Sequence, residues 1–210
     1  GVRTEANLPG EHLYTSSTHP YFRAPHIYIA LPTRLLQERD CSTDILLMTS
    51  RGGPHYDRTF LEAFIRPGLS ASEWTNRANY AAQNVVPTGP AEMSIYVRGR
   101  RYAVRTDGFV ALNAGYAGGE MLTHPLVFGG RELILNYATG ASGALRVEIQ
   151  NADGRALPGL ALDDCPALVG NEVARVVAWR DGSDVATLAG QPVRLRFALQ
   201  DADLFSLRFS

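Results

Sequence analysis

Residues 144–150 (ALRVEIQ) alternate apolar and polar side chains, and residues 151–154 (NADG) follow them directly. Successive side chains of a β-strand point to opposite faces, so Leu145, Val147 and Ile149 would share one face. The Asp-Gly pair supplies the positive φ angles that tight hairpin turns need. These eleven residues therefore predict a strand with one buried face that ends in a hairpin.

Similar apolar segments recur through the C-terminal part of the chain. They are residues 132–137, 173–179, 193–199 and 204–209. Together with residues 144–150 they make about five or six strands, which is enough for two sheets packed face to face around a filled interior. We therefore expect residues 126–210 to form an antiparallel β-sandwich, with Leu195 and Trp179 in its core.

The N-terminal part also favours β-structure, but with longer polar loops between the strands. The expected strands are residues 26–31, 44–50, 59–65, 92–97, 102–105 and 109–112. Two of them follow similar openings, RAPH at residues 23–26 and GPAE at residues 89–92. The separation of these openings, from residue 23 to residue 89, is compatible with one propeller blade following each opening. The expected fold is thus all-β, with a region of partial propeller-like blades at residues 1–125 followed by the sandwich.

Several runs carry a resemblance to a known group of proteins. They are TSRGG (49–53), DRTFLEAFIRPG (57–68), PTGPAEMS (87–94), PVRLRF (192–197) and DADLFS (201–206). With these runs the chain resembles bacterial proteins similar to glycoside hydrolase families 32 and 43. The resemblance implies a five-bladed β-propeller with a C-terminal β-sandwich, and acidic catalytic residues at the starts of inner strands. Glu92 has such a position.

The length of the chain limits how much of that architecture it can hold. A four-stranded blade takes roughly 40 to 50 residues, so the N-terminal part has room for about two blades. Two blades cannot close a ring and would leave a sheet edge uncovered. We therefore expect either a homo-oligomer or a missing N-terminal portion of the propeller to complete the structure.

Glycoside cleavage needs two carboxyl groups with different roles. Glu92 and Glu62 are the best candidates, because burial raises and a neighbouring arginine lowers the pKa of a carboxyl group. Asp57, beside the Gly-Gly-Pro loop at residues 52–54, is the third catalytic candidate. The alternative is that these acids are structural partners of nearby arginines, and the sequence leaves this open.

The candidate substrate-binding residues gather in the polar loops of the same region. They are His26, Arg51, His55, Tyr56, Arg58, Trp74 and Arg77. Guanidinium groups suit sugar hydroxyls and anions, and sugar rings stack on aromatic faces. The alternative is that the loop around Arg51 and His55 is a solvated connection that binds no ligand, and that His26 is an ordinary histidine in the wall of a pocket.

Composition excludes several other functions. The net charge of -1 gives no field that would attract nucleic acid or an anionic membrane.

The histidines lack metal-ligand spacing, and Cys41 and Cys165 lie far apart, so we expect no metal site and no disulfide. No nucleotide-binding or serine-hydrolase motif occurs, and we expect no cofactor. No signal peptide is visible, so the localisation stays unknown.

The favoured function is therefore that of a carbohydrate-active protein, a glycoside hydrolase of the β-propeller type or a part of one. A non-catalytic carbohydrate-binding module and an assembly subunit remain as alternatives. Two carboxyl groups that flank one pocket at roughly 5 to 10 Å would favour hydrolysis.

Overall fold

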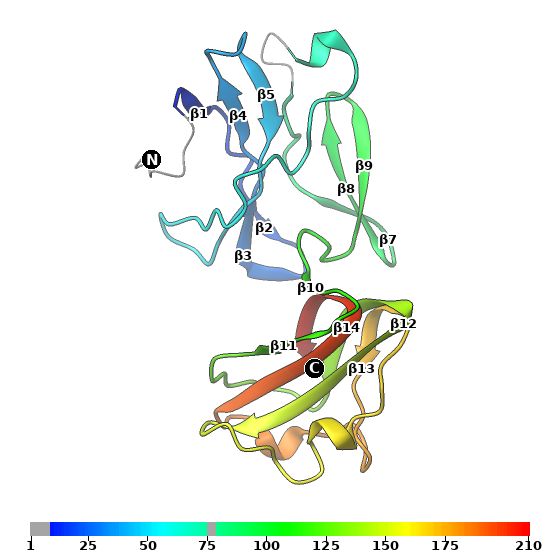
Figure 1. Cartoon of the computed structure of the whole chain (residues 1–210). Helices are drawn as coiled ribbons and strands as arrows, with labels where there is room; N and C mark the ends of the chain where they lie inside the picture. The colour runs from blue at the N-terminus through cyan, green and yellow to red at the C-terminus, as the bar shows by residue number, and fades with distance from the viewer. Residues whose placement is uncertain (1–8, 75–78) are drawn as a thin grey trace. The chain divides into compact units, whose positions relative to one another are not determined.

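The computed structural model describes residues 9–74 and 79–210. As predicted, the structure is all-β, with antiparallel sheets and three short 3-10 helices among the described residues (Figure 1). It divides into two compact units, Gly1–Thr106 and Asp107–Ser210. None of the helices in the described part is long and apolar enough to cross a membrane.

The boundary between the units lies earlier than the expected one at residues 125 and 126. The segment that follows Thr106 contains β10 (Leu112–Ala114) and β11 (Gly119–Leu122). Both strands pair with β14 (Val193–Phe209), so they belong to the C-terminal unit. Sequence spacing alone does not reveal this pairing, because β14, the partner of both strands, is the last strand of the unit in the sequence.

The strands of residues 9–74 and 79–106 form three small antiparallel sheets. The first orders β1 (Glu11–Leu13), β4 (Thr33–Leu36) and β5 (Ser42–Ile45). The second orders β2 (His19–Tyr21), β3 (Ala24–Ala30) and β6 (Met48–Ser50). The third orders β7 (Val86–Gly89), β8 (Glu92–Val97) and β9 (Arg100–Arg105). Each sheet is therefore one strand short of a four-stranded propeller blade.

Most of the expected N-terminal strands are present. The strand predicted at residues 92–97 is β8, and those at 26–31 and 102–105 overlap β3 and β9. The strand predicted at residues 44–50 is interrupted and splits into β5 and β6.

The strand predicted at residues 59–65 is wrong. Only isolated bridges flank this segment, from Asp57 to Thr49 and from Ile65 to Ile45. Phe60 and Leu61 are exposed in succession, so the segment lacks the one-sided burial that fixes a strand in a sheet.

The C-terminal unit is organised by two long strands. β12 (Leu133–Asn151) pairs antiparallel with β14 along nearly its whole length, and β13 (Asn171–Val176) pairs with the first part of β12. The segments predicted as separate strands at residues 132–137 and 144–150 are thus two parts of β12. Those at residues 193–199 and 204–209 are likewise two parts of β14. The predicted turn at residues 151–154 is confirmed, with Gly154 at a φ of 85°.

A bend in the middle of this strand pair lets the two halves share one core. The register shifts between Thr139 and Ala144, opposite Asp201, which has a φ of 44°. A Cβ atom at Gly143 would lie 2.2 Å from the carbonyl oxygen of Asp201, so the close approach requires glycine there.

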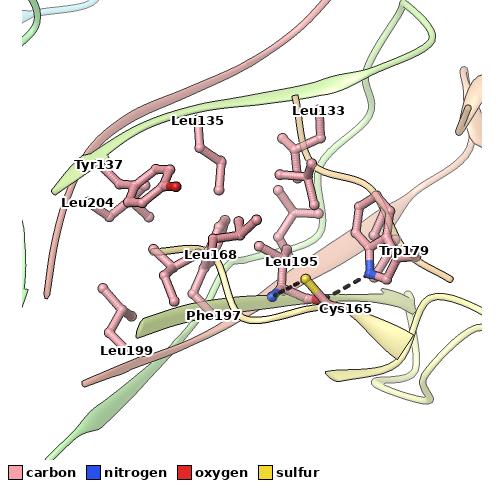
Figure 2. Close-up of a cluster of buried hydrophobic side chains, with 14 of the residues drawn as sticks. Leu133, Leu135, Tyr137, Cys165, Leu168, Trp179, Leu195, Phe197, Leu199 and Leu204 are labelled. Carbon is pink, nitrogen blue, oxygen red and sulfur yellow. Dashed lines mark hydrogen bonds between the residues drawn. The ribbon is translucent and has the colours of Figure 1, made fainter. Parts of the chain in front are cut away.

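Side chains from both halves of the bent sheet meet in this core. Figure 2 shows Leu133, Leu135 and Tyr137 from one half of β12 across from Leu195 and Phe197 of β14. The predicted burial of Leu195 is confirmed, because its side chain is fully enclosed.

Trp179 also lies in this core, as predicted. Its indole N–H donates to the carbonyl oxygen of Val147 at 2.9 Å, and the N–H of Val147 donates to Sγ of Cys165 at 3.4 Å (Figure 2). The polar atoms of these core side chains therefore have partners, as buried polar groups require.

Candidate functional site

A cleft of about 820 Å³ opens in the N-terminal unit. It is lined by the β4–β5 hairpin, by residues 62, 63, 66 and 67, and by Trp74, and we call it the Trp74 cleft. Its charged side chains are Arg34, Glu38, Arg39, Asp40, Asp44, Glu62 and Arg66. Four acids and three arginines leave the cleft close to neutral, with many hydrogen-bond donors and acceptors.

Arg34 anchors the base of the cleft. Its Nε and Nη2 atoms donate to the two carboxylate oxygens of Asp44 at 2.9 and 2.5 Å, and Nη1 donates to the carbonyl oxygen of Leu61 at 2.8 Å. Burial by itself lowers the pKa of Arg34, but the ion pairs with Asp44 and Glu11 outweigh it and raise that pKa above its ordinary value. The guanidinium group therefore stays charged and joins β4, β5 and Leu61.

Glu11 extends this network below the cleft. The Glu11 carboxylate is buried and accepts two hydrogen bonds from Arg58, at 2.5 Å from Nη1 and 3.1 Å from Nη2. It also lies 3.7 Å from Nη1 of Arg34. Arg58, predicted to bind substrate, is thus committed to a buried ion pair, and it does not line the Trp74 cleft.

Trp74 follows the short 3-10 helix η1 (Ala71–Glu73) and is half exposed at the cleft. Its indole N–H donates to the carbonyl oxygen of Gly68 at 2.9 Å. Gly68 is fixed in turn, because its N–H donates to Oε2 of buried Glu73 at 2.6 Å. These two hydrogen bonds tether the exposed ring to the backbone of residues 68–74.

The three predicted catalytic carboxylates do not meet in the Trp74 cleft. Glu62 lines the cleft and is exposed. Glu92 begins β8 in another sheet, where it pairs with Arg101 and accepts a hydrogen bond from Thr88 at 3.0 Å. Asp57 is exposed, and its backbone bridges to Thr49.

Of the remaining predicted binding residues that the structure describes, Trp74 lines the cleft and the others lie apart from it. Trp74 is brought together there with the catalytic candidate Glu62. Arg51, His55 and Tyr56 are exposed in the loop between β6 and Asp57, and His26 is exposed on β3. Arg77 lies outside the described residues.

Sequence reasoning missed the residues at the base of the cleft. Arg34 and Asp44 lie in short strands and are paired across the β4–β5 ladder, so their direct opposition follows from the register. Glu11 comes from β1, which also pairs with β4. The one signal in the sequence is the placement of charged residues inside short apolar strands.

Residues 9–74 and 79–210 contain no group of three or more His, Cys, Asp or Glu side chains that could hold a metal ion. Cys41 and Cys165 are both free thiols. Burial, the larger effect, raises the pKa of the Cys165 thiol above its ordinary value, although the N–H of Val147 opposes this.

Comparisons with known proteins give little further information. No family model matches the chain, and no curated protein matches it. Among solved structures, it is similar to the crystal structure of a glycoside hydrolase family 43 arabinoxylan arabinofuranohydrolase from Bacillus subtilis in complex with cellotetraose. The identity is 13% and the TM-score 0.30, with 93% of this chain covered. The chain spans about half of that protein, 53%, and a TM-score this low establishes neither a shared fold nor a shared function.

Proposed function

We propose that the N-terminal unit binds a carbohydrate chain in the Trp74 cleft. The observation that carries the proposal is the half-exposed indole of Trp74, held by Gly68, at the wall of a cleft rich in both donors and acceptors. Sugar rings pack their C–H faces on such aromatic surfaces while their hydroxyl groups form hydrogen bonds around the edge.

The polar lining supports a hydroxyl-rich ligand better than a strongly charged one. Glu62 and Arg66 line the cleft without an ion-pair partner among the described residues, so both are available to a ligand. Arg34 and Asp44 neutralise each other. A ligand carrying many negative charges would meet four carboxylates, and one carrying many positive charges would meet three arginines.

Hydrolysis is the second candidate function, and Glu62 favours it. A glycosidase places two carboxyl groups on either side of the scissile bond. Glu62 shares the cleft with Asp40 and Asp44, whereas Glu92 is engaged by Arg101 in another sheet. Turnover by this cleft would therefore use Glu62 with a second cleft carboxylate, and not the pair of Glu62 and Glu92.

Intrinsic fluorescence offers a direct test of binding, because the chain has two tryptophans. Trp179 is buried in the C-terminal unit, so a ligand that changes the emission or its quenching by acrylamide acts on Trp74. Xylotetraose, cellotetraose and maltotetraose are suitable probes. We expect at least one of them to shield Trp74 from acrylamide.

Two variants distinguish binding in the Trp74 cleft from binding in the loop at residues 51–56. Calorimetric titration should show that Trp74→Ala removes binding, whereas Tyr56→Ala keeps it, because Tyr56 is exposed but does not line the cleft. The reverse pattern would assign binding to the loop at residues 51–56 and contradict the proposal.

Turnover is measured on the same oligosaccharides by product chromatography. If Glu62→Gln keeps binding and loses turnover by about 10²-fold or more, the hydrolase candidate is supported. Binding with no turnover by the unmodified chain supports the binding module.

A further inference from the structure

A second cleft, of about 490 Å³, lies in the C-terminal unit, far along the sequence from the Trp74 cleft. It is formed by β11, the end of β12, the turn at residues 151–154 and β14. Its polar side chains are Glu120, Gln150, Asp153, Arg194 and Arg196. No predicted site residue lies here.

One wall of this cleft is already neutralised. Arg196 donates from Nη2 to both oxygens of Glu120, at 2.8 and 3.0 Å, and from Nε at 3.1 Å. It also lies 3.6 Å from the buried carboxylate of Glu148. This wall is fixed in place and offers a ligand little unsatisfied charge.

The rest of the cleft has two charged groups that are not paired. Arg194 donates from Nε to the carbonyl oxygen of Ala152 at 3.0 Å, which orients the guanidinium group. Within the described part of the chain, its two Nη atoms have no further partner. The carboxylate of Asp153 likewise has no ion-pair partner there. Arg194 and Asp153 line one cleft without forming an ion pair with each other.

Gln150 adds a third unsatisfied group, and this one is buried. Its side chain is 7% exposed, and its Nε2 donates to Oε1 of Glu148 at 2.6 Å, which fixes the amide. Its Oε1 has no hydrogen-bond partner. A Cβ at Gly154 would be 3.7 Å from this oxygen, so the turn at residues 151–154 lies directly beside it. A buried acceptor without a donor is costly, which suggests that a ligand N–H completes it.

We propose that this cleft binds a small α-amino acid with an apolar side chain. The carboxylate of such a ligand fits the two free Nη donors of Arg194. Its ammonium group supplies donors for Gln150 and Asp153. Its side chain packs on Leu122, the exposed apolar residue of the same cleft. Each unsatisfied group of the cleft then has a partner of matching chemistry.

The test uses the full chain and three probes of nearly equal shape. L-leucine carries both charges, 4-methylpentanoate lacks the ammonium group, and 3-methylbutylamine lacks the carboxylate. Binding is followed by NMR from the amide of Gly154 and the Nε–H of Arg194. We expect L-leucine to shift both signals and to bind at least about 10-fold more tightly than either analogue.

Variants then test which residue of the cleft binds the carboxylate of the ligand and which binds its ammonium group. Arg194→Gln should weaken L-leucine at least about 10-fold, whereas Arg208→Gln, an exposed change on the same strand outside the cleft, should not. Asp153→Asn should weaken L-leucine but leave 4-methylpentanoate unchanged. Equal binding of all three probes, no binding of L-leucine, or a response confined to oligosaccharides would overturn the proposal.

Discussion

Substituting Gly143 with alanine tests whether the bend in the β12–β14 pair depends on a missing side chain. The new Cβ would lie 2.2 Å from the carbonyl oxygen of Asp201, 2.8 Å from that of Gln200 and 3.0 Å from the carbonyl carbon of Asp201. All three atoms belong to the backbone, so no side-chain rotation relieves the overlap. Ordinary contacts between such atoms exceed 3.4 Å, and the two strands must therefore separate at the bend.

The expected loss of stability follows from this geometry. Overpacking a well-packed site costs about 1 to 3 kcal/mol, and more where the backbone must move. We expect Gly143→Ala to lower the free energy of unfolding by about 3 kcal/mol or more. Gly129→Ala is the matched control, because a Cβ there meets nothing within 4 Å and its φ is not positive.

Urea denaturation followed by far-UV circular dichroism and by the fluorescence of buried Trp179 measures both variants. The fluorescence of Trp179 reports on the C-terminal unit, whose core contains this residue. If Gly143→Ala and Gly129→Ala differ by less than about 0.5 kcal/mol, the usual range for neutral surface changes, the two strands do not approach as closely as described.

Three further predictions concern the core, the ion-pair network and the cysteines, and one concerns assembly. Leu195→Ala should lower the free energy of unfolding by about 2 to 5 kcal/mol in urea titrations, because the side chain is fully buried; a loss near zero would contradict its placement. Arg34→Gln should cost about 1 to 3 kcal/mol in the same assay, because it removes the charged hydrogen bonds to Asp44 and one of the two arginines beside the buried carboxylate of Glu11; a variant as stable as the unmodified chain would mean that the network is dispensable. Since burial raises the thiol pKa of Cys165, a thiol reagent near pH 8 should modify Cys41 first and Cys165 only on unfolding; equal rates would refute this. Light scattering during size exclusion tests the expected homo-oligomer, which a mass near 22.9 kDa at micromolar concentration would contradict.

The C-terminal strands could be predicted from sequence because their faces differ in polarity. Val193, Leu195 and Phe197 alternate with charged residues, and the burial pattern of β14 follows this alternation. The continuity of β12 could not be predicted in the same way. Its residues 140–143 (GASG) have the composition of a turn, and in the structure they form a bend that continues the strand. Local sequence does not distinguish the two, because the difference depends on Asp201 in β14.

The candidate site was predictable only where a residue type carries its own chemistry. Trp74 was identified as an aromatic platform in a polar loop and Glu62 as a carboxylate in an expected strand, and both line the cleft. Arg58 has the same loop-like surroundings in sequence but is buried against Glu11, a residue more than forty positions earlier. Such pairings depend on which strands become neighbours, and a single sequence holds no record of that.

The position of β14 among its neighbours also affects how the C-terminal unit is made during protein synthesis. β10, β11 and β12 leave the ribosome first, yet all three pair with β14, which is synthesised after them. Until residues 193–209 emerge, β10 and β11 have no neighbouring strand among those described, and β12 lacks the apolar side chains that β14 adds to the core. Domains otherwise begin to fold as they are synthesised, at about 5 to 20 residues per second. Nascent chains stalled before Val193 should therefore be recognised by chaperones that bind exposed apolar strands.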